Sequence, residues 1–283
     1  MKFVLRGLDN NASSWRLIQE SVATIDQMGF WGLALPDHYM YQYNEKFSAY
    51  STLDSWVALS YLAAKTSAIK LGTLVTPIPF RPPSQLAKIV STLDMLSSGR
   101  AFLGVGAGWS QMEFEAYSEW SNARTRVDKT EEGVRLIQRL WQEPRVDFEG
   151  KFYRAKGAVL EPKPIQKPRP PLLFGGYSLR MIMMAGRYGD ICYVPPWSKI
   201  SLAKAKVIIS QEAREAGRSV PALAGGSPGS QNEKFDMSLV KRDMEASAAA
   251  GCEYYLTPWF PREDYLATVE RFASELMPSF SDR

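Results

Sequence analysis

The residue pair with the clearest chemical potential is Asp37-His38, because His38 is the only histidine in the 283-residue chain. A histidine can donate or accept a proton near neutral pH, and an adjacent carboxylate can fix its tautomer or hold a neighbouring loop. The pair follows the apolar segment 30–35, so a buried strand would deliver both side chains to its carboxyl end. We take His38 as the candidate catalytic residue, with a purely structural histidine as the alternative.

A second segment, 99–109, runs from an apolar strand into Gly104, Gly106 and Gly108 and then into Trp109. Without a Cβ atom, such a strand lets a flat or anionic ligand approach the main chain closely. The alternative is a strand whose glycines only relieve crowding. The dinucleotide fingerprint Gly-x-Gly-x-x-Gly does not fit, because its third glycine is missing whether the count starts at Gly104 or at Gly106.

A third segment, Gly175-Gly176-Tyr177-Ser178, joins a strand to a helix. Main-chain N–H groups at a helix start attract a phosphate group, and Ser178 could add its hydroxyl. A plain tight turn with Ser178 as an ordinary N-cap is the alternative.

Segment 71–77 combines a glycine and two threonines in an apolar strand, which suits either a bulge beneath a planar ring or ordinary barrel packing.

Large aromatic residues near these segments could form the wall of an apolar pocket, or could belong to the core or to an interface. They are Tyr39, Tyr43, Trp109 and Trp197.

Several site classes are disfavoured. A single histidine excludes His-based metal clusters, and a Ser-His-Asp site would lack the Gly-x-Ser-x-Gly turn, so we expect no metal site. Cys192 and Cys252 form no Cys-x-x-Cys motif and predict buried thiols in a reducing cytoplasm.

The net charge of +4 comes without a long Lys/Arg run, so no nucleic-acid partner is expected. No apolar run reaches membrane-span length and no leader pattern follows Met1, which predicts a cytoplasmic protein with no membrane partner.

Apolar and helical segments alternate along the chain. The expected strands are 3–6, 30–35, 69–75, the glycine strand within 99–109, 172–174, 191–194, a very short one within 220–229, and 253–257. The expected helices run from Asn11 or Ser14 to 28, from Ser51 or Asp54 to 64, over 82–96, over 126–142, from 178 onward, and over 202–216, 237–250 and 263–277. Between them, 110–122 reads as an irregular insertion, 146–153 as a short hairpin and 162–171 as a proline-rich connector.

This alternation predicts the α/β fold class: a (β/α)₈ TIM barrel in one domain over residues 1–283, with the irregular insertion after strand four and the hairpin before strand five. A doubly wound sheet is the alternative. A barrel demands that functional residues gather at the carboxyl ends of its strands. The unusual residues named above do fall there.

Four runs of residues occur in an order typical of one family. They are 29–38, Leu71-Gly72-Thr73, the long run from Leu93 to Trp109, and Gly150-Lys151-Phe152-Tyr153 with Pro162-Lys163-Pro164. The chain thus resembles the bacterial-luciferase-like flavin and deazaflavin oxidoreductases. Within that family, the chain resembles the branch that uses the deazaflavin coenzyme F420, because of its Asp37-His38 pair and its modest length.

The resemblance implies positions for the cofactor. Asp37 and His38 would lie near the deazaflavin, with Leu74 and Val75 at a bulge, often a non-proline cis peptide, that backs the ring, and Thr73 would also be a cofactor-binding residue. The ribityl and phosphate part would meet Gly106-Ala107-Gly108 and Gly175-Gly176-Tyr177-Ser178. Tyr39, Trp109 and Trp197 would line the substrate pocket. Relatives that oxidise glucose 6-phosphate have a glutamate where Trp109 stands, so that activity is not expected.

The resemblance also implies a function. We expect hydride transfer between coenzyme F420 and a small organic substrate, with His38 as a proton donor or ring-orienting group. An FMN-dependent monooxygenase using O₂ is one alternative, and a barrel that binds flavin without turnover is another. A homodimer formed through helices of the early barrel is expected.

Overall fold

The computed structural model describes residues 1–6, 12–40, 52–226 and 235–281. The expectations that fall on Asn11, Tyr43, Ser51 and residues 227–229 lie outside the described residues.

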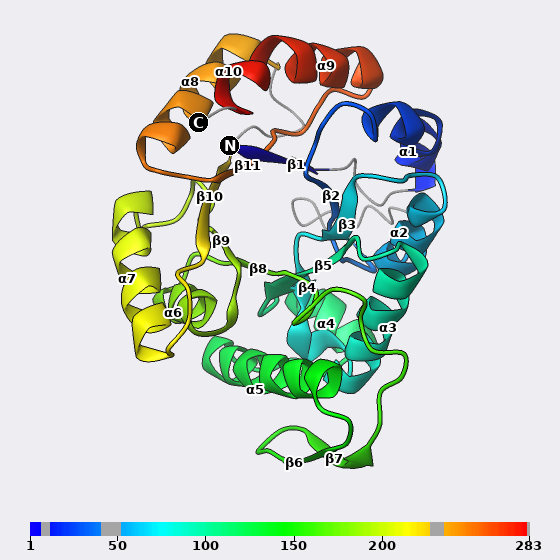
Figure 1. Cartoon of the computed structure of the whole chain (residues 1–283), viewed down its shortest axis with the longest axis vertical. Helices are drawn as coiled ribbons and strands as arrows, with labels where there is room; N and C mark the ends of the chain where they lie inside the picture. Colours follow the sequence, from blue (N-terminus) through cyan, green and yellow to red (C-terminus); the bar gives the residue numbers. More distant parts are fainter. Residues whose placement is uncertain (7–11, 41–51, 227–234, 282–283) are drawn as a thin grey trace.

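The strands form one closed parallel sheet (Figure 1). Their order is β3-β2-β1-β11-β10-β9-β8-β5-β4, and a pairing between β3 and β5 closes the ring. β3 and β4 are two pieces of the third strand, so the ring has the eight positions of the predicted (β/α)₈ barrel. The barrel strands are β1 (Lys2–Arg6), β2 (Gly32–Leu35), β3 (Lys70–Thr73), β4 (Thr76–Pro77), β5 (Ala101–Gly106), β8 (Leu172–Gly175), β9 (Ile191–Tyr193), β10 (Ala222–Gly226) and β11 (Tyr254–Leu256).

Helices surround the barrel on all sides (Figure 1). They are α1 (Ala12–Ile25), α2 (Ser55–Ala63), a 3₁₀ turn (Ile78–Phe80), α3 (Pro83–Leu96), α4 (Gln111–Tyr117), α5 (Ala123–Gln142), α6 (Leu179–Tyr188), α7 (Leu202–Glu215), α8 (Met237–Ala249), α9 (Tyr265–Arg271), a π-helical turn (Phe272–Leu276) and α10 (Pro278–Ser281). The antiparallel hairpin of β6 (Val146–Glu149) and β7 (Arg154–Ala158) projects below α5.

Three of the differences from the sequence-based expectations concern the insertion, helix α5 and the hairpin. The insertion at 110–122 is not wholly irregular, because it contains α4. Helix α5 begins at Ala123 rather than near Arg126, because the Asn122 side chain accepts a hydrogen bond from the main-chain N–H of Thr125 and caps the helix there. The hairpin extends to Ala158, since residues 150–153 form its turn and its second strand follows them.

Side-chain caps explain where several helices begin. Asp54 accepts from the main-chain N–H groups of Trp56 and Val57, both at 3.0 Å, and so starts α2. Ser201 caps α7 and Asp236 caps α8 in the same way. These polar residues satisfy N–H groups that have no partner within their own helix.

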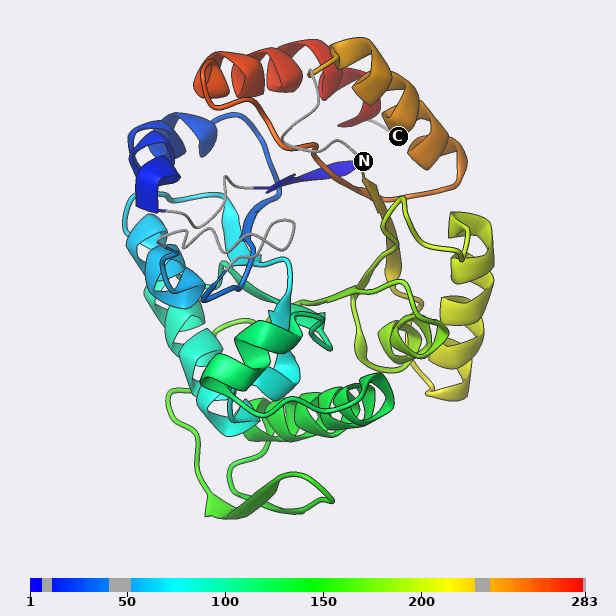
Figure 2. The same ribbon diagram turned by 180° about the vertical axis from the view of Figure 1, so that it is seen from behind.

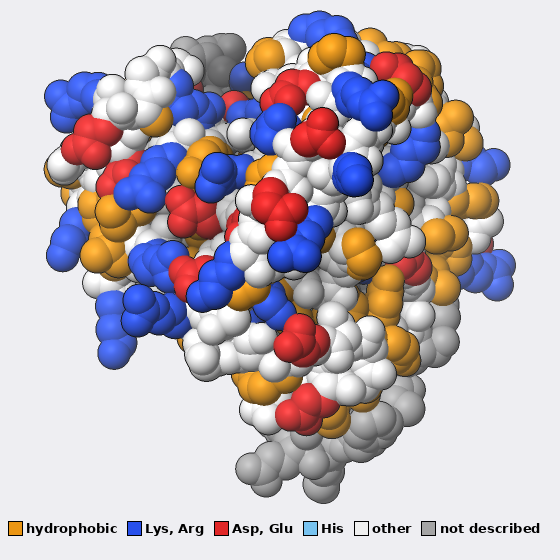
Figure 3. Space-filling model, turned by 90° about the horizontal axis from the view of Figure 1, so that it is seen from below, with side chains coloured by type: hydrophobic (Ala, Val, Ile, Leu, Met, Phe, Trp, Pro, Cys, Tyr) orange, Lys and Arg blue, Asp and Glu red, His pale blue; other side chains and the backbone are white. Residues whose placement is uncertain are grey.

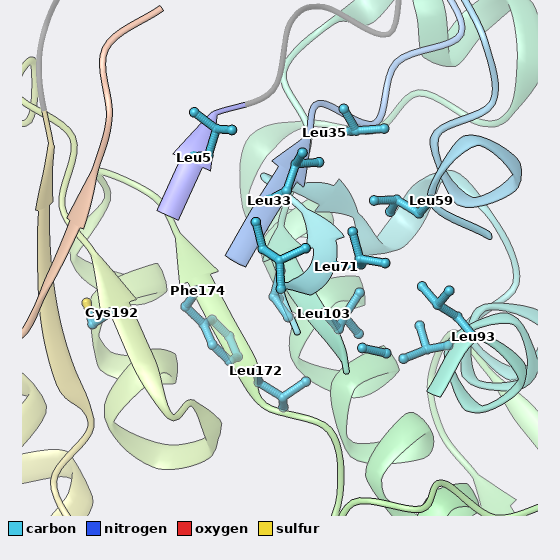
Figure 4. Packing of buried hydrophobic residues seen from close by; sticks show 14 of the residues in the cluster. Leu5, Leu33, Leu35, Leu59, Leu71, Leu93, Leu103, Leu172, Phe174 and Cys192 are labelled. Atoms are coloured by element: carbon cyan, nitrogen blue, oxygen red, sulfur yellow. The ribbon is translucent and has the colours of Figure 1, made fainter. Parts of the chain in front are cut away.

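Two apolar clusters hold the fold together. The larger one lies between the strands and the helices, and in Figure 4 Leu59 and Leu93 turn from α2 and α3 toward leucines of β2, β3 and β5. The smaller one fills the barrel interior, where Trp31 packs against Phe102 at 5.2 Å and Tyr254 at 5.1 Å between ring centres. The interior is therefore a packed core and leaves ligand chemistry to the rims.

The surface mixes charges of both signs. On the face that carries α5 and the hairpin, Lys and Arg side chains alternate with Asp and Glu (Figure 3). Among the described helices, none combines the length and the apolar character needed to cross a membrane.

Both cysteines are buried free thiols. Burial raises the pKa of the Cys192 thiol to about 12 and that of the Cys252 thiol to about 12. Because the thiolate is the reactive form, we predict that neither cysteine reacts rapidly with a thiol reagent at neutral pH in the native protein. Both should react once the chain is unfolded in denaturant. Fast stoichiometric labelling of the native protein would contradict this burial.

Candidate active site

The candidate site residues emerge at one end of the barrel. Because the strands run parallel, every segment that follows a strand lies at the same rim. His38 follows β2, Trp109 follows β5 and the Gly175-Gly176 corner ends β8. Strand β5 pairs with β3, β4 and β8, so the break at residues 74–75, the segment after β5 and the corner at β8 are neighbours around this rim. The rim faces the viewer in Figure 2, where the short green helix α4 crosses in front of the strands.

The third strand is broken at Leu74-Val75, which are joined by a non-proline cis peptide bond. The main-chain N–H of Leu74 donates to the carbonyl of Leu35 at 2.9 Å and keeps the break attached to β2. Both side chains are half-buried and pack on top of the cluster inside the barrel. Leu74 and Val75 thus give the rim an apolar floor.

Three of the glycines make room for this break. A Cβ atom on Gly104 would lie 1.9 Å from the carbonyl oxygen of Thr73, and one on Gly106 would lie 2.4 Å from Cγ2 of Val75. A Cβ atom on Gly175 would lie 2.7 Å from Cγ1 of Val75. The relief of crowding, given above as the alternative for the glycine strand, therefore explains Gly104 and Gly106.

Asp37 is buried, and its carboxylate is engaged within the protein. Both terminal nitrogens of Arg81 donate to it, Nη1 to Oδ2 at 2.5 Å and Nη2 to Oδ1 at 3.0 Å. Oδ2 also accepts from Thr76 Oγ1 at 2.6 Å and from Trp56 Nε1 at 3.2 Å. Burial lowers the pKa of Arg81, but the hydrogen bonds and charge of Asp37 outweigh it, so the pKa is raised overall. Asp37 therefore ties the end of β2 to β4, α2 and the segment before α3.

The imidazole of His38 pairs with a different carboxylate. Nδ1 of His38 lies 2.8 Å from Oε2 of Glu113, a side chain on α4 that is only 2% exposed. The other oxygen, Oε1, accepts from the main-chain N–H groups of Tyr39 at 2.5 Å and Met40 at 3.3 Å. Trp109 packs edge-on against the imidazole, with ring centres 5.7 Å apart. The option that Asp37 fixes the tautomer is thus wrong, and Asp37 instead holds the neighbouring segments.

Tyr39 lies on the same side of the rim as His38. Its ring packs edge-on against Phe80 and Tyr117, with centres 5.1 and 5.3 Å apart. Its hydroxyl accepts a hydrogen bond from Nη2 of Arg81 at 3.0 Å. Burial raises the pKa of Tyr39, with the Arg81 charge acting in the opposite direction. The residue thus joins the Asp37–Arg81 pair to the aromatic side of the rim.

Gly108 turns the chain from β5 into α4. Its φ of +80° lies in the left-handed region that favours glycine, and a Cβ atom there would also meet the Phe114 ring at 2.5 Å. Nε of Arg126 donates to the Gly108 carbonyl at 3.2 Å, and its guanidinium stacks on Trp120 at 3.9 Å. Ala107 and Gly108 are half-buried. The main chain after β5 is therefore held in place yet open to the rim.

The corner after β8 leads into helix α6. Gly175 and Gly176 are half-buried, whereas Tyr177 and Ser178 are exposed. The Ser178 side chain accepts from the main-chain N–H of Met181 at 3.4 Å, as an ordinary N-cap does. The other N–H groups of the first helical turn have no partner within the helix.

Three large aromatic side chains stand exposed along the rim. Trp109, Tyr177 and Trp197 are 59%, 60% and 61% exposed. Trp109 and Tyr39 lie on the His38 side, whereas Trp197 follows β9, beyond the corner at β8. The predicted pocket residues Tyr39, Trp109 and Trp197 are therefore spread around the rim.

Glu113 and Arg81 were not predicted as site residues. Glu113 falls in a polar and aromatic stretch without a regular period, so the helix that carries it was not expected. Its spacing from Ser110 in Ser110-Gln111-Met112-Glu113 does match the signature of a helix start. In the structure Ser110 is the N-cap residue of α4, but the Glu113 carboxylate turns toward His38.

Comparison with known proteins adds a family and a fold. A model of the luciferase-like monooxygenase family matches residues 2–229. An F420-dependent hydroxymycolic acid dehydrogenase of Mycobacterium tuberculosis (strain ATCC 25618 / H37Rv) is 32% identical over 237 residues, 83% of this chain and 62% of that protein. An FMNH(2)-dependent dimethylsulfone monooxygenase of Pseudomonas putida is 35% identical over 130 residues, 46% of this chain and 36% of that protein. The chain thus spans less than two thirds of these relatives.

A solved structure extends the likeness over the whole chain. An F420-dependent secondary alcohol dehydrogenase, in complex with an F420-acetone adduct, superposes with a TM-score of 0.83 at 20% identity and covers 99% of each chain. At this identity the match shows the barrel fold alone.

Proposed function

Because the chain belongs to the luciferase-like monooxygenase family, we propose that it is an oxidoreductase that transfers a hydride between coenzyme F420 and a small organic substrate. The observation that carries the proposal is the convergence of three unlike features on one rim. They are the His38–Glu113 pair, the apolar floor and the glycine corner that opens α6. Relatives named for F420-dependent and FMNH(2)-dependent reactions support a flavin or deazaflavin cofactor.

The residues of the rim fit a phosphorylated tricyclic cofactor. The half-buried Leu74 and Val75 offer a flat apolar support for a ring, with Thr73 beneath them. The ribityl and phosphate part would meet Gly106-Ala107-Gly108 and the corner Gly175-Gly176-Tyr177-Ser178. The α6 dipole favours an anion there by about 0.3 to 1 kcal/mol, in addition to main-chain hydrogen bonds.

The protein's part in the reaction is to position the reactants and to move a proton. The bound cofactor supplies hydride chemistry, which these side chains cannot. His38 exchanges the proton that accompanies the hydride, since its imidazole can both donate and accept near neutral pH. Trp109 packs against that imidazole, and its exposed indole offers an apolar surface to the substrate. We therefore infer a small, partly apolar substrate.

An FMN-dependent monooxygenase is the second candidate. The dimethylsulfone monooxygenase relative supports it, since it is named for reduced FMN. FMN also carries a ribityl phosphate, so the same corner and floor would serve it. O₂ would then be the second substrate.

Cofactor binding separates these candidates. The purified chain is mixed with F420 and with FMN in separate titrations, and quenching of cofactor fluorescence is recorded. We expect tight binding of F420 and turnover with a member of an alcohol and ketone panel. Tight FMN binding without F420 binding would overturn the choice of cofactor. A cofactor that binds but is never oxidised or reduced across the panel would overturn the enzymatic proposal in favour of a carrier.

We also propose that the chain forms a homodimer through α2 and α3. Val57 on α2 and Leu96 on α3 are 70% and 67% exposed, the two highest values among the large apolar side chains that the structure describes. Tyr61 and Met95 add further exposed apolar surface. Hydrophobic side chains are visible along the right-hand flank in Figure 3, the side that α2 and α3 occupy in Figure 1.

Light scattering after size-exclusion chromatography tests the dimer. The native protein should have twice the 31.8 kDa mass of the chain. The double variant Val57→Glu, Leu96→Glu should be monomeric, because burying two carboxylates in an apolar interface is costly. Val207→Glu is the matched control, since Val207 is 66% exposed on α7 across the barrel, and it should stay dimeric. A monomeric native protein would contradict the proposal.

A further inference from the structure

We propose that Glu113 is a positioning residue that holds His38 in the Nδ1–H tautomer, which leaves Nε2 as the acceptor nitrogen of the ring. The inference deepens the proposed function, on which it rests for any effect on turnover. The tautomer itself can be measured without cofactor or substrate.

The Glu113 carboxylate faces the main chain with one oxygen and His38 with the other. Oε1 of Glu113 faces two main-chain N–H groups, those of Tyr39 and Met40, at 2.5 and 3.3 Å. Such groups can only donate, so Oε1 acts as an acceptor toward both. Oε2 is then the oxygen that faces Nδ1 of His38 at 2.8 Å.

A hydrogen bond between Glu113 and His38 needs one donor and one acceptor. An ionised carboxylate accepts through both oxygens and donates through neither. If Glu113 is ionised, the contact at 2.8 Å requires a proton on Nδ1 of His38. In the neutral ring, a proton on Nδ1 means that Nε2 carries a lone pair. A carboxylate that orients a histidine in this manner is a recurring device in enzymes.

Among the described residues, the two carboxylates nearest in sequence to His38 and Glu113 are engaged elsewhere. Asp37 precedes His38 in the chain, but both of its oxygens are engaged by Arg81. Glu115 is exposed on the same helix, and its Oε1 accepts from the side chain of Gln111 at 2.7 Å. Burial favours the Glu113 contact further, since its side chain is 2% exposed and that of His38 is 13% exposed.

The chain lends itself to a direct test, because His38 is its only histidine. Untagged protein labelled with ¹⁵N-histidine shows a single imidazole in a long-range ¹H–¹⁵N spectrum, in which the protonated and unprotonated nitrogens have well-separated shifts. The spectrum is titrated to the alkaline limit at which the ring is neutral. We expect the Nδ1–H pattern in the wild-type protein, and an Nε2–H pattern would overturn the proposal.

The variant Glu113→Gln sharpens the test. Its amide oxygen can keep the main-chain hydrogen bonds, so its NH₂ group must face His38 and donate to Nδ1. The tautomer should therefore reverse to Nε2–H. Glu115→Gln is the matched control, being the same charge removal on the same helix, and it should keep the wild-type spectrum. A Glu113→Gln protein with an unchanged pattern would overturn the proposal. If this variant does not fold, the wild-type spectrum alone decides.

Turnover provides the second readout. With F420 and an active substrate, Glu113→Gln should lower kcat by about 10- to 100-fold, because Nε2 of His38 then carries a proton in place of its lone pair. Cofactor affinity should change little, and Glu115→Gln should behave as wild type. If no F420 turnover is found in any variant, the proposed function fails while the spectrum still decides the role of Glu113. An unimpaired Glu113→Gln enzyme with a reversed tautomer would overturn the link between the two.

Discussion

Replacing His38 with glutamine should lower kcat for hydride transfer by about 10²- to 10⁴-fold, the range expected when a general acid or base is removed. Glutamine can hydrogen-bond to Glu113 but cannot exchange a proton near neutral pH. The imidazole is also the only one in the chain, so no neighbouring histidine can replace it. The change in F420 absorbance during turnover measures the effect.

The same variant separates catalysis from binding. The affinity for F420, followed by fluorescence quenching, should stay within a few-fold of wild type, because the proposed main-chain contacts at the corner after β8 are untouched. Thermal unfolding should confirm that the variant is folded. Near-normal turnover in a folded His38→Gln protein would show that His38 only shapes the rim and moves no proton.

The second large effect concerns stability. Asp37→Asn should lower the free energy of unfolding by about 3 to 5 kcal/mol, because it leaves the Arg81 guanidinium buried without its counter-charge. The side chains of this pair are 0% and 9% exposed, so water cannot replace the lost partner. The hydroxyl of Thr76 and the indole N–H of Trp56 lose their charged acceptor at the same time. Urea unfolding followed by circular dichroism measures the change.

Two further variants test the cause of this loss. Adding Arg81→Met to Asp37→Asn should recover part of the stability, because both buried charges are then gone. Glu20→Gln breaks the Arg16–Glu20 pair, whose side chains are 85% and 58% exposed, and should leave stability nearly unchanged. If Asp37→Asn is as mild as Glu20→Gln, the buried pair does not stabilise the rim as we propose.

The barrel could be predicted because its signals are local and repeat along the chain. Each barrel strand is a short run with apolar residues, most helices begin at a polar residue or a proline, and the alternation leaves few topologies open. The break at Leu74-Val75 was expected from the family resemblance rather than from the residues themselves. Strand β10 was the hardest to place, because glycine and alanine dominate it and show little β preference.

The pairing around His38 could not be predicted in the same way. Glu113 lies 75 positions along the chain, and only the closed ring brings α4 back over β2. Asp37 was the natural candidate because it is adjacent in sequence, yet successive residues of an extended segment point to opposite sides. Arg81 could not be predicted as a site residue either, because nothing in its own segment shows that a buried carboxylate faces it.

The crowding that the glycines of the rim relieve could not be predicted from the sequence. Ligand approach and relief of crowding were both open for Gly104 and Gly106, and a Cβ atom at either position would collide with the third strand. A sequence shows where a side chain is missing without showing what occupies the space.

The methyl groups of Val75 lie against both Gly106 and Gly175, so three separate strands share one small volume. Relatives with alanine at position 75 can accept a larger residue at 106 or 175, whereas a bulkier residue at 75 leaves no room for one. These positions should consequently change together during evolution, and library designs that randomise one of them should randomise all three.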